Sequence, residues 1–261
     1  MKKIKILHKS FTKPISCLTA YSPSIANILD GKIDLILVGA SIGSTLYGMD
    51  NTQGVTMDMM KNHGAAVNKT IKKSLKVLDM PYKTYDNKID AYKNAKILLN
   101  CCKPDLLKIE ISEKKLVVLK HLVDKQINVI SHIGVTPQSY KNFNKIKVLG
   151  KTNKEKQNLL ELAKESEKLG AKAVLLECIT TNTAKLITEN ISIPTIGIGA
   201  SKYCDGQILV FDDLINLTTN DKKPKFVKNY FNFNKIVGNV VKKYNNEVKL
   251  KKFPSTKFTY N

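Results

Sequence analysis

Short apolar runs recur eight times along the chain, and this recurrence limits the possible folds more than any other feature. The runs are four to six residues long and rich in leucine or β-branched residues, and several end at glycine or proline, as buried parallel strands tend to. They occupy residues 16–19, 33–38, 75–80, 106–110, 128–133, 173–178, 194–198 and 207–211.

Between most of these runs lie segments with the spacing of amphipathic helices, for example over 89–99, 113–123 and 154–169. Eight alternations of strand and helix within about 200 residues predict an α/β protein with a closed (β/α)₈ TIM barrel. An open doubly wound sheet is the alternative, because that fold also alternates strands and helices.

The C-terminal segment from Asp221 onward differs from the rest in being rich in lysine and asparagine. Apolar and aromatic residues recur in it at helical spacing, which predicts a packed C-terminal helix or helix pair. This stripe consists of Phe226, Tyr230, Phe233, Ile236, Val237, Val240 and Val241. We find no repeat and no strong linker, so we expect one barrel domain over 1–261 with a helical tail over about 222–261.

The chain has 43 basic and 22 acidic residues, a formal net charge of +21, and all of its basic residues are lysines. Such a balance favours a polyanionic partner, so a basic nucleic-acid-binding protein is one alternative. Proteins that read nucleic acids rely on arginine for bidentate contacts, and this chain has no arginine. We therefore interpret the lysine excess mainly as compositional drift and expect no nucleic-acid partner.

The cysteines and the apolar runs indicate the compartment. The five cysteines are odd in number and form no C-x-x-C pair, which favours a reducing environment over a disulfide framework. The longest apolar run, 33–43, contains Asp34 and is far shorter than the roughly 20 residues that span a bilayer. We expect a cytoplasmic protein with no membrane partner.

Ionisable residues gather at the ends of four successive apolar runs. They are Asp79, Lys108 with Glu110, His132 and Glu177. In a barrel all strands end at one mouth, so these side chains are expected to converge there. Each has an ordinary structural explanation alone, but burying all of them without partners would cost several kcal/mol. A metal or an anionic ligand is the natural compensation.

The residue types suit one kind of chemistry. Asp79 and Glu110 are oxygen ligands of the kind that Mg²⁺ prefers, and Lys108 can stabilise an enolate oxygen or a carboxylate. Apolar neighbours should raise the pKa of Glu177 toward that of a useful base. Together they indicate proton abstraction next to a carbonyl, followed by formation or cleavage of a carbon–carbon bond.

At these residues the chain resembles the ketopantoate hydroxymethyltransferase family. The stretches that carry the resemblance keep the family's order and spacing over about residues 15–250. They are LTAYSPSIA at 18–26, VGASIGSTLYGMDNT at 38–52, LDMPY at 78–82, LLKIE at 106–110, SHIGVTPQS at 131–139, LLECI at 175–179, IPTIGIGAS at 193–201, CDGQILV at 204–210 and PKF at 224–226.

The resemblance implies a (β/α)₈ barrel of the phosphoenolpyruvate mutase/isocitrate lyase type, assembled as a homo-oligomer, usually a decamer. It implies transfer of a hydroxymethyl group from 5,10-methylenetetrahydrofolate to 3-methyl-2-oxobutanoate, with Mg²⁺, giving 2-dehydropantoate for pantothenate synthesis. It also implies a role for each site residue. The 2-oxo acid would be held by Ser41, Asp79, Lys108 and His132, the metal by Asp79 and Glu110, and the general base would be Glu177.

The chain departs from the family pattern most seriously at Ala40, where a metal-binding aspartate usually precedes the serine. A methyl group cannot bind magnesium, so this departure predicts weakened metal binding, although water can fill a vacant Mg²⁺ position. It also supports an alternative, a relative that acts on another 2-oxo acid by aldol or lyase chemistry. Smaller departures occur at Ile111, at Ser201 and over 256–258.

Overall fold

The computed structural model describes residues 3–7, 9, 13–142, 146–217 and 223–260. The chain separates into two compact units, Met1–Val210 and Phe211–Asn261. The expectation of one domain over 1–261 stays a prediction, and the first residues of the expected tail, Asp221 and Lys222, lie outside the described residues.

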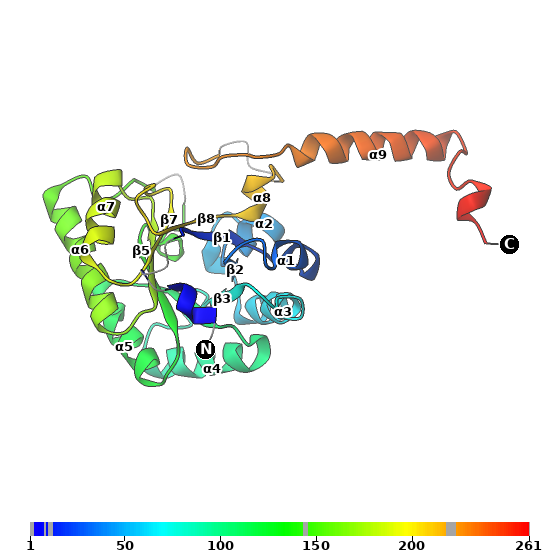
Figure 1. Ribbon diagram of the computed structural model, residues 1–261. Coiled ribbons are helices and arrows are strands. Elements are labelled where there is room, and N and C mark those ends of the chain that lie inside the picture. Colours follow the sequence, from blue (N-terminus) through cyan, green and yellow to red (C-terminus); the bar gives the residue numbers. More distant parts are fainter. Residues whose placement is uncertain (1–2, 8, 10–12, 143–145, 218–222, 261) are drawn as a thin grey trace. The chain divides into compact units, whose positions relative to one another are not determined.

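Eight parallel strands in the described part of the first unit close into a barrel in chain order, and β8 pairs with β1 (Figure 1). The strands are β1 (Ile15–Thr19), β2 (Leu35–Val38), β3 (Leu75–Asp79), β4 (Leu106–Glu110), β5 (Val129–Gly134), β6 (Ala173–Glu177), β7 (Thr195–Ile198) and β8 (Gly206–Leu209). Every apolar run therefore forms a strand whose ends lie within two residues of the predicted bounds. The predicted barrel is confirmed, and the open doubly wound sheet is wrong.

Helices follow most of the strands and surround the barrel (Figure 1). They are α1 (Pro23–Leu29), α2 (Ile42–Leu46), α3 (Met57–Asn68), α4 (Lys88–Cys102), α5 (Leu116–Asp124), α6 (Asn153–Lys168) and α7 (Thr181–Asn190). Short 3₁₀ turns are η1 (Lys3–Leu7), η2 (Thr52–Gly54), η3 (Glu113–Lys115) and η4 (Pro137–Ser139). Helix α6 begins at a capping box, because Thr152 and Glu155 each accept from the other's backbone N–H.

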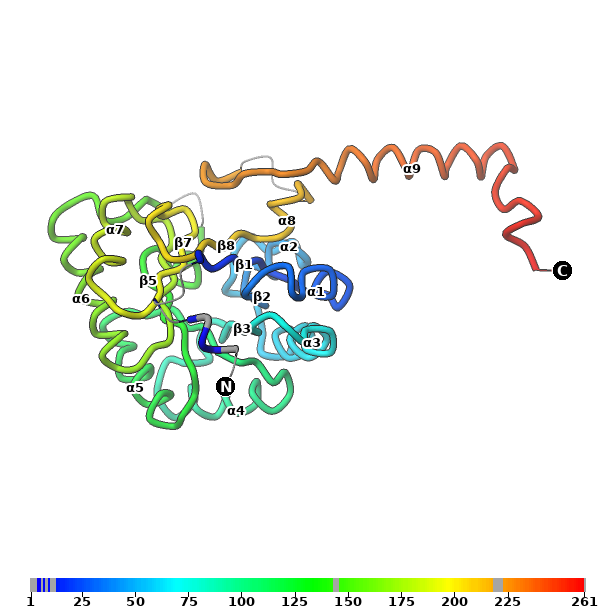
Figure 2. The backbone as a smooth tube through the Cα atoms, viewed as in Figure 1, coloured from blue at the N-terminus to red at the C-terminus, as the bar shows by residue number. Residues whose placement is uncertain are grey.

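The barrel interior is filled by inward-facing apolar side chains from all eight strands, and the N-terminal turn η1 adds to this core. Leu7 belongs to the buried cluster and Ile4 packs against it, so η1 lies against the barrel interior (Figure 2). The clustered strand residues include Leu35, Leu37, Leu75, Val77, Leu106, Ile130, Ala173 and Leu175. Because this interior is packed with apolar side chains, inward-facing polar side chains are found at the two ends of the barrel.

At the lower end, where the strands begin, carboxylates accept hydrogen bonds from backbone N–H groups. Asp34, Asp105 and Asp205 each accept one such bond at 2.8 Å. The donors are the N–H groups of Ser16, Lys76 and Thr195. Asp30 likewise accepts from the backbone of residues 72–74. These bonds satisfy backbone donors at the strand starts and in the loops before them.

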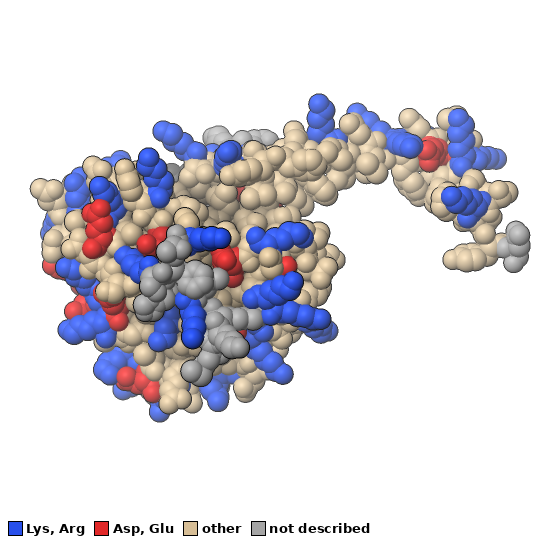
Figure 3. Space-filling view, viewed as in Figure 1, with Lys and Arg blue, Asp and Glu red and all other residues tan. Residues whose placement is uncertain are grey.

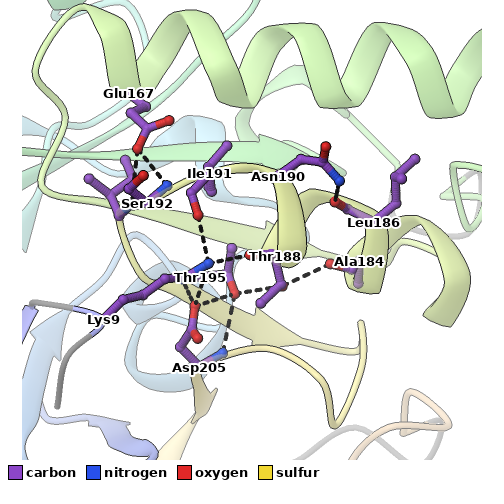
Figure 4. Close-up of polar contacts among 11 residues, drawn as sticks. Lys9, Glu167, Ala184, Leu186, Thr188, Asn190, Ile191, Ser192, Thr195 and Asp205 are labelled. Atoms are coloured by element: carbon purple, nitrogen blue, oxygen red, sulfur yellow. Dashed lines mark hydrogen bonds and ion pairs between the residues drawn. The ribbon is translucent and has the colours of Figure 1, made fainter.

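Lys9 ties the N-terminal segment to the last strands at this lower end (Figure 4). Its ammonium donates to the carbonyls of Thr188 and Ile191, the latter at 2.7 Å, and lies 3.8 Å from the Asp205 carboxylate. These carbonyls lie at the C-terminal end of α7, where no further N–H of the helix is available to donate to them. The positive charge of the lysine also interacts favourably with the negative end of the helix dipole. Asp205 in turn accepts from the Thr195 hydroxyl at 3.0 Å.

In the second unit the structure has α8 (Phe211–Leu214), α9 (Phe233–Lys249) and a 3₁₀ turn η6 (Thr256–Phe258). The predicted C-terminal helix is present from Phe233 onward, but its packing stays a prediction. Its predicted extension back through Phe226 and Tyr230 is wrong, because Asn232 caps α9 by accepting the Lys235 N–H at 3.1 Å. None of the described residues of α9 is buried.

Charge is spread over the face of the barrel that Figure 3 shows. The lysines that Figure 3 shows on the barrel are scattered among acidic and uncharged residues, and others follow α9. No helix among the described residues combines the length and the apolar character needed to cross a membrane.

Candidate active site

The upper end of the barrel, where the strands finish, holds all the residues that the sequence nominates. A cavity of about 110 Å³ opens there. Its lining includes Ser41, Asp79, Lys108, Glu110, His132 and Glu177. The fold therefore brings every candidate residue to one cavity. Their functional roles stay predictions.

Strand periodicity explains how these side chains reach the cavity. Alternate residues of a strand face the same side, so Leu106, Lys108 and Glu110 of β4 all point inward, one above another. The lowest is part of the apolar core and the upper two line the cavity. In register, Asp79 of β3 lies beside Lys108, and His132 of β5 lies beside Glu110.

Lys108 and Asp79 form a buried ion pair, with 2.8 Å between Nζ and Oδ1. The other Asp79 oxygen accepts the backbone N–H of Ala40, also at 2.8 Å. Burial alone would lower the pKa of Lys108, but the Asp79 and Glu110 carboxylates together raise it. The lysine is therefore held as a cation inside the cavity.

Glu110 is fixed by the loop that follows β5. The backbone N–H of Gln138 lies 3.1 and 3.2 Å from its two carboxylate oxygens. Burial raises the pKa of Glu110 to about 8, and Lys108 and the Gln138 N–H oppose part of this rise. His132 responds in the opposite sense, because burial and the Lys108 charge hold its pKa well below its usual value. Its imidazole is therefore neutral, with Nδ1 3.4 Å from Lys108 Nζ.

Glu177 is the most accessible carboxylate of the set, with 17% of its side chain exposed. Its Oε2 lies 3.2 Å from His132 Nε2. Burial raises the pKa of Glu177 to about 7, with Lys108 acting against the rise. A carboxylate of this pKa takes up and releases a proton near neutrality, as a general base must.

The backbone around Glu177 is tightly constrained. Gly134 adjoins it in the barrel with a φ of +95°, and a Cβ there would lie 2.4 Å from the Glu177 carbonyl oxygen. Only glycine fits this contact. Cys178, directly after Glu177, adopts a left-handed conformation with a φ of +48°, which is uncommon for a residue with a side chain. Glu177 thus lies between a position that requires glycine and a sharp turn of the backbone.

A surrounding layer of polar residues was not predicted from the sequence. The Tyr21 hydroxyl lies 2.6 Å from Ser41 Oγ, and the Tyr85 hydroxyl donates to Gln138 Oε1 at 2.6 Å. Tyr21 and Gln138 lie within stretches that resemble the known family, so a signal for them existed. Tyr85 lies after β3, outside the stretches that carry the resemblance, and no sequence pattern indicates that it is near the site.

The carboxylates have the chemistry to bind a hard cation. A carboxylate offers about four acceptor sites. One Asp79 oxygen is in the ion pair with Lys108, the other accepts the Ala40 N–H, and Glu110 shares a single N–H, so both carboxylates retain capacity. No group of three His, Cys, Asp or Glu side chains in the described ranges is arranged to hold a metal ion. Two carboxylates with spare acceptor capacity are of the kind that Mg²⁺ takes, because this ion uses one or two carboxylates and obtains its other oxygens from substrate and water.

Solved structures with the same architecture share little sequence with this chain. Phosphonopyruvate hydrolase complexed with oxalate and Mg²⁺ matches with a TM-score of 0.62 and 12% identity, over 98% of this chain and 92% of that one. A 2,3-dimethylmalate lyase, described as a phosphoenolpyruvate mutase/isocitrate lyase superfamily member, matches with a TM-score of 0.59 and 12% identity, over 99% and 86%. The chain thus has the same (β/α)₈ barrel fold as these two proteins.

Comparison of the sequence with known proteins identifies the family. The model of the family described as ketopantoate hydroxymethyltransferase matches residues 2–256. The 3-methyl-2-oxobutanoate hydroxymethyltransferase of Pelagibacter ubique is 45% identical over 255 residues, covering 98% of this chain and 97% of that protein. The chain belongs to the ketopantoate hydroxymethyltransferase family.

Proposed function

We propose that this protein transfers a hydroxymethyl group from 5,10-methylenetetrahydrofolate to 3-methyl-2-oxobutanoate, giving 2-dehydropantoate for pantothenate biosynthesis. Relatives named for the hydroxymethyl transfer match nearly the whole chain. The observation that carries the proposal is the set of Lys108, His132 and Glu177 around one cavity, with the pKa of Glu177 raised to about 7. This set supports abstraction of a proton next to a keto group.

Substrate binding is assigned to Ser41, Asp79, Lys108 and His132. The Lys108 ammonium supplies the positive charge that the anionic 2-oxo acid needs, and Asp79 holds that ammonium in place at 2.8 Å. Ser41 begins the α2 segment with its hydroxyl positioned by Tyr21. The neutral imidazole of His132 lies between the lysine and Glu177 without adding charge.

Glu177 is the proposed general base. It removes the proton from C3 of the 2-oxo acid, and Lys108 stabilises the negative charge that develops on the keto oxygen. The resulting enolate carbon attacks the methylene carbon carried by the folate. The attack breaks one of the two C–N bonds to that carbon, and the released nitrogen takes up the proton that Glu177 removed. Water then displaces the second nitrogen, so that its hydroxyl stays on the carbon and its proton goes to the departing tetrahydrofolate.

Asp79 and Glu110 would hold Mg²⁺. When bound, Mg²⁺ polarises the substrate's keto group and makes the C3 proton more acidic. Ala40 lines the same cavity and donates its backbone N–H to Asp79, but its methyl group offers no ligand. We propose that the cation is accordingly held by few protein ligands and more weakly than a third carboxylate would allow.

We further propose that the protein acts in the cytoplasm as a homo-oligomer, a decamer by its resemblance to the family, with the 2-oxo acid and the reduced folate as its partners. We also propose that Phe211–Asn261 serves as the helical tail of the barrel domain rather than as an independent domain.

The test is an assay of the purified protein with 3-methyl-2-oxobutanoate, 5,10-methylenetetrahydrofolate and Mg²⁺. We expect formation of 2-dehydropantoate that depends on all three. Absence of product at high protein and Mg²⁺ concentrations would contradict the proposal. Release of a small aldehyde from another 2-oxo acid without folate would instead favour aldol or lyase chemistry.

A further inference from the structure

One of the buried hydroxyls that line the cavity has no role in the proposed mechanism and no partner among the described residues. Thr52, the first residue of η2, is 4% exposed and lines the cavity beside Ala40 and Ser41. Within the described part of the chain its Oγ1 has no hydrogen-bond partner. An unmade hydrogen bond on a buried hydroxyl is unfavourable, so a ligand that enters the cavity is the natural partner.

Both neighbours of Thr52 are anchored to the loop after β5, which fixes where its hydroxyl lies. The Asn51 side chain donates to the carbonyl of Lys141 at 3.1 Å and accepts the Gln53 N–H at 2.9 Å. The Gln53 side chain donates to the carbonyl of Gln138 at 2.8 Å. The turn that carries Thr52 is thereby held to the same loop that fixes Glu110.

The other groups in the cavity indicate what this hydroxyl binds. Asp79, Glu110 and Glu177 supply only acceptors when ionised, and Lys108 is already paired with Asp79. A small 2-oxo acid presents carboxylate and keto oxygens, which are acceptors and need donors. Thr52 offers a donor without bringing a second buried charge into the cavity.

We propose that Thr52 is a further substrate-binding residue, whose hydroxyl donates to an oxygen of the 2-oxo acid group. This inference rests on the proposed function, because it takes a small 2-oxo acid as the ligand. It also assigns a purpose to the unsatisfied hydroxyl, which is retained for binding at a cost to the stability of the free protein.

The experiment measures the Kd of 3-methyl-2-oxobutanoate by calorimetry, with Mg²⁺ present, for the full-length protein and two variants. Thr52→Val keeps the shape and removes the hydroxyl, and we expect about tenfold weaker binding. Thr52→Ser keeps the hydroxyl, and we expect binding within about threefold of the wild type. The free Thr52→Val protein should melt no lower than the wild type, because it loses no hydrogen bond between described residues.

Thr56→Val is the matched control. The Thr56 side chain caps α3 by accepting the Met59 N–H at 3.2 Å, and it is exposed. This variant should melt lower and bind the 2-oxo acid as the wild type does. Unchanged binding by Thr52→Val beside a binding wild type would overturn the Thr52 assignment and leave the proposed function standing. A wild type that binds no 2-oxo acid would overturn both.

Discussion

At the lower end of the barrel, carboxylates accept hydrogen bonds from backbone N–H groups, whereas at the upper end they share one cavity with a lysine and a histidine. The same residue types thus meet different surroundings. Burial alone would raise the pKa of Asp30 at the lower end, but the N–H groups of residues 72–74 lower it. Burial raises the pKa of Glu110 and Glu177 at the upper end to about 8 and 7.

This difference separates stabilising from reactive carboxylates. A carboxylate surrounded by backbone donors stays ionised and contributes to folding, while one that lacks enough donors becomes a proton acceptor near neutral pH. Substitutions at the two ends should therefore affect different measurements: activity at the upper end and stability at the lower end.

The largest effect is expected for Glu177→Gln. The amide cannot accept the C3 proton, so the rate should fall by about 10²–10⁴-fold. The measurement is exchange of the C3 proton of 3-methyl-2-oxobutanoate into deuterated water, followed by NMR. Because the variant removes a carboxylate that burial disfavours, its melting temperature should not fall. Undiminished exchange would remove Glu177 from the role of base.

Asp205→Ala should show the opposite behaviour. It removes the acceptor for the N–H and hydroxyl of Thr195 and the partner of Lys9. We expect the free energy of unfolding to fall by about 2 kcal/mol, measured by urea titration. Proton exchange catalysed by the folded variant should stay near that of the wild type. A loss of exchange with full stability would contradict the assignment of this end to folding.

Ala40→Asp adds a carboxylate to the upper end, beside Asp79. If the cation is held by too few protein ligands, its affinity should rise by about tenfold. Binding of Mn²⁺ as a substitute, followed by electron paramagnetic resonance, measures this without requiring turnover. Ala40→Asn, with a neutral side chain of similar size, is the control. Equal affinity of all three proteins would contradict a cation site at Asp79.

Tyr85→Phe tests the layer behind the cavity. The Tyr85 hydroxyl donates to Gln138, whose own N–H fixes Glu110, so its loss should let Glu110 move. We expect kcat to fall by about threefold to tenfold with a smaller change in KM. The exposed Tyr244→Phe is the control and should match the wild type. A variant with unchanged kcat would exclude a positioning role for Tyr85.

A last pair of predictions concerns the pH dependence of stability. The folded pKa of Glu110 lies above its ordinary value of 4.5, so its stabilising contribution is complete below that value and is lost as pH rises toward about 8. The folded pKa of Asp30 lies below 3.8, so its contribution is present above 3.8 and is lost at lower pH.

Urea titrations across this range separate the two contributions. Glu110→Gln should flatten the decline in stability between about pH 5 and pH 8, and Asp30→Asn should change only the acid side. Because Glu177 also has a raised pKa, of about 7, part of the decline should remain in Glu110→Gln. A decline as steep as that of the wild type would contradict the contribution of Glu110.

The sequence predicted the barrel and its site for one physical reason. Strands of a closed parallel barrel are buried on both faces, so they appear as continuous apolar runs, and a charged residue at the end of such a run is conspicuous. Lys108 and His132 were found in this way.

The supporting contacts could not be found by the same reasoning. Tyr85 meets Gln138 and Lys9 meets Asp205 only after the chain has folded, and no local pattern encodes such pairs. The predicted start of the C-terminal helix was wrong for a related reason. Helical spacing continued back to Phe226, but the cap at Asn232 decides where α9 begins.

The contact of Lys9 with α7 has a consequence for how the protein is made. Lys9 and Ile191 are 182 positions apart, and β1 pairs with β8. During synthesis β1 therefore has an unpaired edge until β8 has been made. The barrel closes late, and its unfinished intermediate is the form in which a chaperone would meet this chain.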